Sequence, residues 1–323
     1  MSIKITKPGI YSSVQDQGRF GFRRYGVPVS GSMDKFAAGI ANLLIGNSRN
    51  EAVLEITLHG LEFIFLQDSL VSFAGGGSRP YADHHALDMY KAIWLPKDTV
   101  VNFRHHPDGC RLYMGIAGGW SEPLFMKSRS CFPTAGAGKV IKAGDQLSGG
   151  LPSPLAVKIV GEMDTSKISM AGWGYSETSI RTDIVRVIKG PEWDLFSEDS
   201  RNSWLRSSFT VTQSSNRMGY RLSGDPLLLG VKKEMISTAV TMGMVQVTPD
   251  GMPLLLMADA QTIGGYPRIA TVIDADLPVC AQIKPGDKIR FKEVTPHFAE
   301  ALYIEKEEQL LRLEHLINTK MQM

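Results

Sequence analysis

The stretch GMVQVTPDGMPLLLMADAQTIGGYPRIATVI, residues 243–273, decides the fold class of this chain. It contains three short apolar runs, residues 243–247, 253–257 and 269–273, which are separated by Gly, Pro and Asp. Short runs of branched and aliphatic residues bounded by such turn formers are typical of β-strands joined by tight turns. The stretch therefore predicts neighbouring strands of a sandwich or barrel, not alternating strands and helices.

The same pattern recurs along most of the chain. We therefore expect a mainly β protein with a few helices, built as two β-barrel domains. The remaining expected strands cover residues 3–5, 52–58, 61–66, 70–73, 100–103, 111–116, 156–160, 184–188, 209–212 and 288–291.

Three segments have helical periodicity instead. Residues 33–44 place apolar side chains on one face, and Ser32 is the expected cap at the start. Residues 191–205 begin with a proline, which suits a first helical turn. Residues 298–319 carry Leu310, Leu313 and Ile317 on one face, so this last helix is expected to pack on the body of the protein or on a partner.

A pair of motifs occurs twice in the chain, which indicates that one domain is a duplicate of the other. GGW at residues 118–120 is followed by KAGD at 142–145, and GGY at residues 264–266 is followed by KPGD at 284–287. Gly-Asp turns commonly precede a closing strand, because glycine supplies the positive φ. We expect two related barrels with a boundary in the polar stretch 162–182, which gives domains at 1–170 and 171–295 and a helical tail at 296–323.

Composition narrows the function classes. Lys plus Arg number 35 and Asp plus Glu number 33, so the net charge of +2 lacks the basic excess of a nucleic-acid-binding protein. No apolar run approaches the length of about 20 residues that spans a bilayer. The N-terminus has no signal-peptide pattern, and the three cysteines are far apart. We therefore expect a cytoplasmic protein with reduced thiols and no nucleic-acid or membrane partner.

Several catalytic motifs are missing from the sequence. It contains no HExxH, no CxxC pair and no GxSxG elbow, so we expect no metal. AGAGK at residues 135–139 resembles a phosphate loop but has Pro133 where the motif needs glycine and Val140 where it needs Ser or Thr.

Three polar clusters, residues 15–34, 216–221 and 259–266, occur at glycine-rich turns. One interpretation is local capping, with Ser32 and Asp34 at a helix start and Asp16 and Asp259 in Asx-turns. The other is a polar cleft in which arginine and amide groups orient a carboxylate or phosphate, while glycine lets the ligand approach the backbone. Composition alone leaves both interpretations open.

Long stretches of the chain resemble a known family. They include SVQDQGRFGFRRYGVPVSGSMDKFAAGIANLLIGN from residue 13, AVLEIT from residue 52, SSNRMGYRL from residue 214 and IKPGDKIRF from residue 283, besides the stretch quoted first. On these motifs the chain is identified as a member of the allophanate hydrolase subunit 2-like family. That family includes the C subunit of prokaryotic 5-oxoprolinase, the sporulation regulator KipA and the carboxyltransferase region of urea carboxylase.

The resemblance implies a fold, partners and an activity. The implied fold is a pair of cyclophilin-like β-barrels. The implied role is that of the C subunit in a 5-oxoprolinase, which converts 5-oxo-L-proline, ATP and water to L-glutamate, ADP and phosphate. The implied partners are a subunit 1-like (KipI-like) protein and a LamB/YcsF-like subunit, with ATP used by the assembled complex and no activity of this chain alone.

The resemblance also implies roles for the residues at the turns. A lactam is a poor electrophile, so groups that hold the phosphate and the substrate carboxylate matter more than a nucleophilic side chain. The proposed catalytic residues are Arg217, Asp259, Gln261 and Thr262, and the proposed substrate- or phosphate-binding residues are Arg19, Arg24, Ser30, Gly264, Gly265 and Tyr266. We expect the strongest site where Arg217 meets residues 259–266, joined by the loop 15–34. The alternative is that Arg217 pairs with Asp259 only to lock two turns.

The sequence departs from the family in two places, at Trp120-Ser121-Glu122 and at residues 81–94 with His84 and His85. Two other functions stay open. A carboxyltransferase would use biotin on another chain, because Met126-Lys127-Ser128 lacks the second methionine of a biotinylation site. A KipA-like regulator would need only a surface for its partner.

Overall fold

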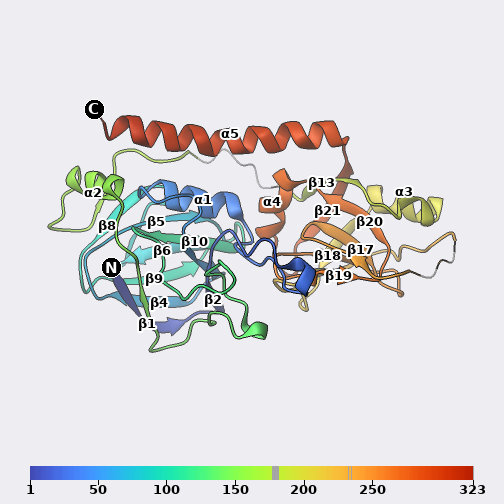
Figure 1. Ribbon diagram of the computed structural model, residues 1–323, viewed down its shortest axis with the longest axis horizontal. Coiled ribbons are helices and arrows are strands. Elements are labelled where there is room, and N and C mark those ends of the chain that lie inside the picture. The colour runs from blue at the N-terminus through green and yellow to red at the C-terminus, as the bar shows by residue number, and fades with distance from the viewer. Residues whose placement is uncertain (177–181, 232, 234, 323) are drawn as a thin grey trace. The chain divides into compact units, whose positions relative to one another are not determined.

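The computed structural model describes residues 1–176, 182–231, 233 and 235–322 (Figure 1). By its contacts the chain divides into two compact units. The first unit contains Met1–Arg19, Ser30–Ser179 and Glu307–Met323, and the second contains Phe20–Val29 and Ile180–Lys306.

The predicted division into 1–170, 171–295 and 296–323 is continuous along the sequence and stays a prediction. The contact-based units differ from it, because the first unit extends past residue 170, residues 20–29 count with the second unit, and the end of the last helix counts with the first. The predicted boundary stretch 162–182 includes residues 177–181, which lie outside the described residues.

The first unit contains two six-stranded antiparallel sheets. The first sheet has the order β11 (Gln146–Ser148), β1 (Ser2–Pro8), β4 (Leu61–Phe65), β9 (Val100–His105), β6 (Ser78–Ala82) and β7 (His85–Ala86). The second sheet has the order β12 (Ser169–Met170), β8 (Ala92–Leu95), β5 (Ser69–Gly75), β10 (Arg111–Ile116), β3 (Val53–Thr57) and β2 (Tyr11–Gln15).

Alternation of side chains builds the core of this unit. In β4, Leu61, Phe63 and Phe65 are fully buried, whereas the residues between them are partly exposed. Phe63 and Leu54 of β3 belong to one hydrophobic cluster drawn from strands of both sheets. Neighbouring side chains of a strand point to opposite faces of the sheet. The face of the second sheet that does not contribute to this cluster is covered by α1 (Lys35–Leu43).

Helix α1 packs closely on its sheet. A Cβ at Gly115 of β10 would lie 2.8 Å from the carbonyl oxygen of Ala41, so only glycine fits there. The expected cap Ser32 is wrong. The helix begins at Lys35, which places the capping position at Asp34, and the Asp34 carboxylate accepts a hydrogen bond from the Ala37 amide at 2.8 Å.

The strand expected at residues 156–160 is also wrong, because this segment lies in helix α2 (Pro154–Gly161). A short apolar run does not by itself distinguish a strand from a helix. The deciding signals precede it: the Ser153 hydroxyl caps the Ala156 amide, and Pro154 occupies the first turn.

The second unit is a closed seven-stranded barrel with a separate two-stranded ribbon. The barrel order is β13 (Ile184–Lys189), β20 (Arg268–Val272), β17 (Met244–Val247), β18 (Pro253–Leu256), β15 (Gly219–Ser223), β14 (Ser208–Val211) and β21 (Lys288–Glu293), and the ribbon pairs β16 (Thr238–Ala239) with β19 (Ile263–Gly264). Strands β13 and β21 pair in parallel and close the barrel. The prediction of a mainly β protein with barrel architecture is confirmed, while its likeness to cyclophilin stays a prediction.

The helix expected at residues 191–205 is divided into a 3-10 turn, Trp193–Leu195, and helix α3 (Glu198–Arg206). Ser197 caps α3, and its side chain accepts from the Ser200 amide. Trp204 of α3 stacks on Phe291 of the barrel, with ring centroids 3.9 Å apart. Helix α4 (Leu277–Ala281) and three further 3-10 turns (Arg23–Tyr25, Pro133–Ala135 and Asp274–Asp276) complete the short helical elements of the described chain.

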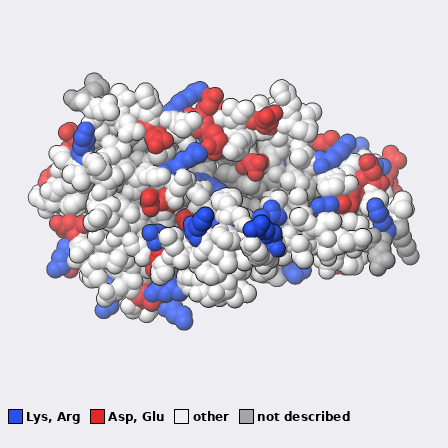
Figure 2. All heavy atoms as spheres, viewed as in Figure 1, with Lys and Arg blue, Asp and Glu red and all other residues white. Residues whose placement is uncertain are grey.

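The last helix, α5 (Pro296–Lys320), was expected at residues 298–319. Its residues Leu310, Leu313 and Ile317 are buried in a cluster of the first unit that includes Ile40 of α1. The expectation of packing on the body is therefore confirmed for this part of the helix. Among the described helices, none combines the length and the apolar character that crossing a membrane requires. On the face drawn in Figure 2, acidic and basic side chains are interspersed.

Candidate functional site

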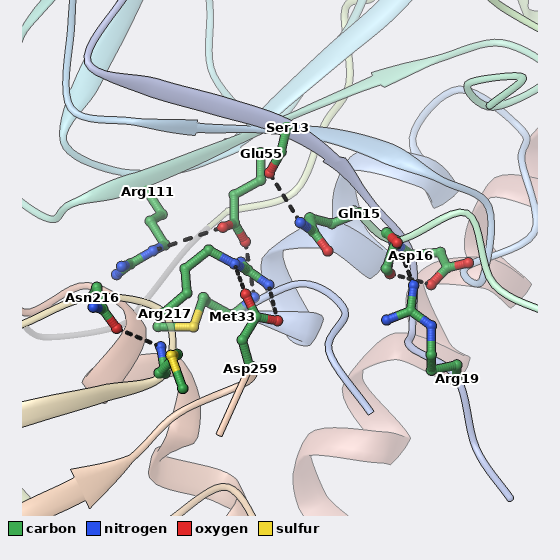
Figure 3. Close-up of polar contacts among 12 residues, drawn as sticks. Ser13, Gln15, Asp16, Arg19, Met33, Glu55, Arg111, Asn216, Arg217 and Asp259 are labelled. Atoms are coloured by element: carbon green, nitrogen blue, oxygen red, sulfur yellow. Dashed lines mark hydrogen bonds and ion pairs between the residues drawn. The ribbon is translucent and has the colours of Figure 1, made fainter. Parts of the chain in front are cut away.

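The second unit brings Arg217 and Asp259 together. The Arg217 Nε lies 2.8 Å from Asp259 Oδ2, and Nη2 lies 3.2 Å from Oδ1, so the contact is bidentate (Figure 3). The Asp259 amide also donates to the Arg217 carbonyl at 2.9 Å, just beyond the pairing of β15 with β18. Both side chains are about nine-tenths buried, at 8% and 11% exposure, so the pair joins the two turns, and a catalytic role for these two residues stays a prediction.

Gln246 fixes the segment that follows Asp259. This residue of β17 is fully buried, and its Nε2 donates to the carbonyl of Tyr266 at 3.2 Å. Gln261 Nε2 donates to Gln246 Oε1 at 3.4 Å. A Cβ at Gly264 would lie 2.6 Å from Gln246 Nε2, so a side chain at this position would displace the Gln246 amide. One buried amide thus holds the two ends of the segment against the barrel.

The remaining predicted residues of this segment lie at its surface or at the ribbon. Thr262 is 8% exposed, and its carbonyl accepts from the Val240 amide at 3.0 Å. Tyr266 is 43% exposed. Gly265 lies beside Ser237, whose hydroxyl would be 3.4 Å from an added Cβ. Of these residues, Tyr266 has the side chain that is open to solvent, and a ligand contact for the others stays a prediction.

The loop 15–34 is divided between the units. Its middle part, Phe20–Val29, counts with the second unit, where Arg23 donates a hydrogen bond to the Val240 carbonyl beside the ribbon. Arg24 is exposed and lies over the Tyr25 ring, 4.7 Å from its centroid. Arg23, which the sequence analysis did not select, thus joins this part of the loop to Val240, whose amide donates to the Thr262 carbonyl.

Asp16 and Arg19 connect the start of the loop 15–34 to residues 125–132 of the first unit. The Asp16 carboxylate accepts hydrogen bonds from the Gly18 amide, the Arg129 amide and the Ser128 and Ser130 hydroxyls at 2.5–2.7 Å. Arg19 is fully buried, donates to the Ser130 carbonyl and lies between two rings, each 5.6 Å away. Those rings belong to Phe125 and Phe132. The arrangement ties the loop to residues 125–132, and a ligand contact for Arg19 stays a prediction.

A buried polar row in the first unit was missed by the sequence analysis. Ser13 of β2, Glu55 of β3 and Tyr113 of β10 lie side by side in register. Glu55 Oε2 accepts from the Met33 amide at 2.9 Å, and Oε1 lies 3.8 Å from Arg111 Nε (Figure 3). Burial, followed by the charge of Glu55, raises the pKa of Tyr113 well above its usual range. A glutamate in the middle of the apolar run VLEIT was the available signal.

Metal and phosphate ligands were also sought among the described residues. No group of three or more His, Cys, Asp or Glu side chains in this part of the chain is arranged to hold a metal ion. In the glycine-rich loop, Lys139 pairs with Asp145 at 3.1 Å, and the Gly136 amide donates to the Pro133 carbonyl. These contacts lie within the loop, which lacks the glycine and the Ser or Thr of a complete P-loop motif.

The comparison of the sequence with known families places this chain. Residues 25–293 match the family described as carboxyltransferase domain, subdomain A and B, and the chain belongs to that family. Among curated relatives, it is 35% identical to the 5-oxoprolinase C subunit of Escherichia coli (strain K12), covering 95% of each chain. It is 33% identical to the 5-oxoprolinase C subunit of Haemophilus influenzae, covering 96% of each.

Longer eukaryotic proteins contain a similar region. The chain is 28% identical to urea amidolyase of Lachancea kluyveri over 99% of its own length, but spans only 18% of that protein. Among solved structures, the Kluyveromyces lactis urea carboxylase matches with a TM-score of 0.85 and 26% identity, over 97% of this chain and 29% of that one. A structure named TTHA0988 matches with a TM-score of 0.77 and 27% identity, over 90% of this chain and 55% of that one.

Proposed function

We propose that this chain is the C subunit of a multi-subunit, ATP-dependent 5-oxoprolinase, which opens 5-oxo-L-proline to L-glutamate. One observation carries the proposal. Similarity to the Escherichia coli 5-oxoprolinase protein extends over 95% of that protein at 35% identity, whereas similarity to urea amidolyase of Lachancea kluyveri covers 18% of that protein at 28% identity.

The proposed complex contains two further proteins. One is a subunit 1-like (KipI-like) partner and the other is a LamB/YcsF-like subunit. Both bacterial relatives are named as subunits, which supports a shared enzyme. The sequence of this chain has no complete nucleotide-binding motif, so ATP enters the proposal as a co-substrate of the assembled complex, and this chain alone is expected to be inactive.

The proposed mechanism depends on residues at turns that bind and orient the substrate, more than on a nucleophilic side chain. The amide carbon of a lactam is poorly electrophilic, and a phosphoryl group from ATP would turn its oxygen into a leaving group. The residues of this chain then have to orient the ring and exclude bulk water. We assign that work to Gln261 and Thr262 as orienting groups for the lactam or for water, with Arg217 and Asp259 completing the catalytic set.

The proposed binding residues follow the same logic. Gly264 and Gly265 leave backbone uncovered beside Tyr266, whose partly exposed ring can contact a five-membered ring. Arg24 is exposed and can meet the substrate carboxylate or a phosphate. Arg19 and Ser30 are buried in the first unit and are proposed as binding residues on the strength of their motif.

The proposal is tested by reconstitution. The three purified subunits are mixed with 5-oxoproline and ATP, and released glutamate is measured by an enzyme-coupled assay. We expect glutamate formation that requires ATP and that stops when this chain is omitted. Equal turnover without this chain, or no turnover with all three subunits folded and associated, would contradict the proposal.

A second function is favoured by the structural comparison. The TM-score of 0.85 with urea carboxylase supports a carboxyltransferase that uses biotin carried on another chain. The discriminating measurement supplies biotinylated carrier, biotin carboxylase, ATP, urea and labelled bicarbonate. Label entering urea only when this chain is present would favour carboxyl transfer, and its absence alongside glutamate release from 5-oxoproline would favour the oxoprolinase.

A further inference from the structure

Three buried oxygen atoms of the first unit have no hydrogen-bond partner among the described residues. They are Oε1 of Gln15 and the hydroxyl oxygens of Ser30 and Ser32. The three residues are 0%, 2% and 0% exposed. Most buried polar groups in proteins are hydrogen-bonded, so three exceptions in neighbouring segments need an explanation.

The three residues belong to two segments that are bonded together. The Ser32 amide donates to the Asp16 carbonyl at 2.8 Å, directly after Gln15. At Gly31, between the two serines, a Cβ would lie 2.9 Å from the Gly18 amide nitrogen, so the segments touch through their backbones. The side-chain nitrogen Nε2 of Gln15 donates to the Ser13 hydroxyl at 2.9 Å, which leaves the side-chain oxygen Oε1 of Gln15 as the available acceptor (Figure 3).

The charges around these atoms favour contact with a neutral group of a ligand. Residues 13–19 and 30–34, with the neighbouring Glu55 and Arg111, contain three carboxylates and two guanidinium groups. This set has no positive excess to attract a phosphate or a carboxylate. An acceptor such as Gln15 Oε1 would also repel the oxygen atoms of an anion, whereas an N–H group would satisfy it.

We propose that these three atoms recognise the amide edge of a lactam, with Gln15 Oε1 accepting from the ring N–H and the Ser30 and Ser32 hydroxyls donating to the ring carbonyl. In a five-membered lactam the N–H and C=O groups are cis and point to the same side. One acceptor and two hydroxyl groups on two segments that are bonded together match that edge. This inference rests on the proposed function, because 5-oxoproline is the lactam that a 5-oxoprolinase binds.

The proposal predicts a specific combination of kinetic and stability effects. Ser32→Ala removes a hydroxyl that lacks a partner among the described residues, so the melting temperature should stay the same or rise while the KM for 5-oxoproline rises about tenfold. Gln15→Met, which keeps the length of the side chain, should also raise KM about tenfold, the effect of losing one hydrogen bond to the substrate. A purely structural role would lower the melting temperature and leave KM unchanged.

Ser78 offers a matched control. It is 2% exposed, its hydroxyl also has no partner among the described residues, and it lies on β6 in the other sheet. Ser78→Ala should affect stability as Ser32→Ala does, because both remove a buried hydroxyl without a partner. It should leave KM unchanged.

The outcomes separate this inference from the proposed function. If the wild-type complex turns over 5-oxoproline and both site variants keep its KM, the lactam site is wrong and the function stands. If the wild-type complex shows no turnover, calorimetry of the chain with the neutral probe 2-pyrrolidinone decides the inference. Binding that Ser32→Ala weakens and Ser78→Ala does not supports it, and no binding to the wild type overturns it.

Discussion

Replacing Arg217 with alanine leaves the Asp259 carboxylate, which is 11% exposed, without the guanidinium that contacts both of its oxygens. Removing one partner of a buried ion pair typically costs about 3–5 kcal/mol, because a buried charge is left uncompensated. Since the pair retains some exposure, we expect the lower end, about 3 kcal/mol for Arg217→Ala. Asp259→Ala should cost a similar amount for the same reason.

The assay is a double-mutant cycle measured by urea denaturation. Arg217→Ala and Asp259→Ala together should cost about 4 kcal/mol, less than the sum of the single variants, since the double variant leaves no unpaired charge. The matched control is Arg201→Ala, which breaks a pair with Asp194 whose side chains are 31% and 93% exposed. That exposed pair should contribute less than about 1 kcal/mol.

The argument that burial makes this pair important for stability would be refuted by either of two results. One is a free-energy loss of the double variant that equals the sum of the single losses, and the other is an Arg217→Ala variant as stable as the wild type. Turnover of the same variants in the assembled complex separates structure from function. If the double variant folds and assembles but releases no glutamate, the pair contributes to catalysis as well as to folding. If it folds, assembles and releases glutamate at the wild-type rate, the pair only locks the two turns.

Two further predictions concern other residues of the second unit. Burial opposes ionisation of Glu192, but hydrogen bonds from Arg268 outweigh it and hold the pKa of Glu192 below its usual 4.5. Glu192→Gln should therefore be less stable than the wild type at neutral pH, with the difference shrinking as the pH falls below 4.5, measured by denaturation across the pH range. Gly264→Ala would place a Cβ 2.6 Å from Gln246 Nε2 and should cost about 1–3 kcal/mol, whereas Gly172→Ala, with open space around it, should melt like the wild type.

Much of the fold could be predicted because local patterns decide it. The alternating burial of Leu61, Phe63 and Phe65 follows directly from the period of a strand. Residues 156–160 could not be assigned from their own composition, because a five-residue apolar run fits either a strand or a helix. Their helix is set by Ser153 and Pro154, which precede the run.

The candidate site was only partly predictable. The meeting of Arg217 with residues 259–266 was expected from their polar turns, and the structure places the Arg217–Asp259 pair there. Gln246 was missed because a single glutamine within a strand gives no sign of its hydrogen bonds to a segment that follows it in the chain. The row containing Glu55 was missed for a similar reason, since strand register joins distant residues that sequence patterns do not pair.

The central claim is that this chain is a required, stoichiometric subunit of a 5-oxoprolinase. The most direct measurement titrates the chain into fixed amounts of the subunit 1-like and LamB/YcsF-like partners and follows glutamate release from 5-oxoproline and ATP. We predict a rate that starts at the background, rises with added chain and saturates at a fixed molar ratio to the partners. A rate that is already maximal before the chain is added, or that never rises above background, would contradict the claim.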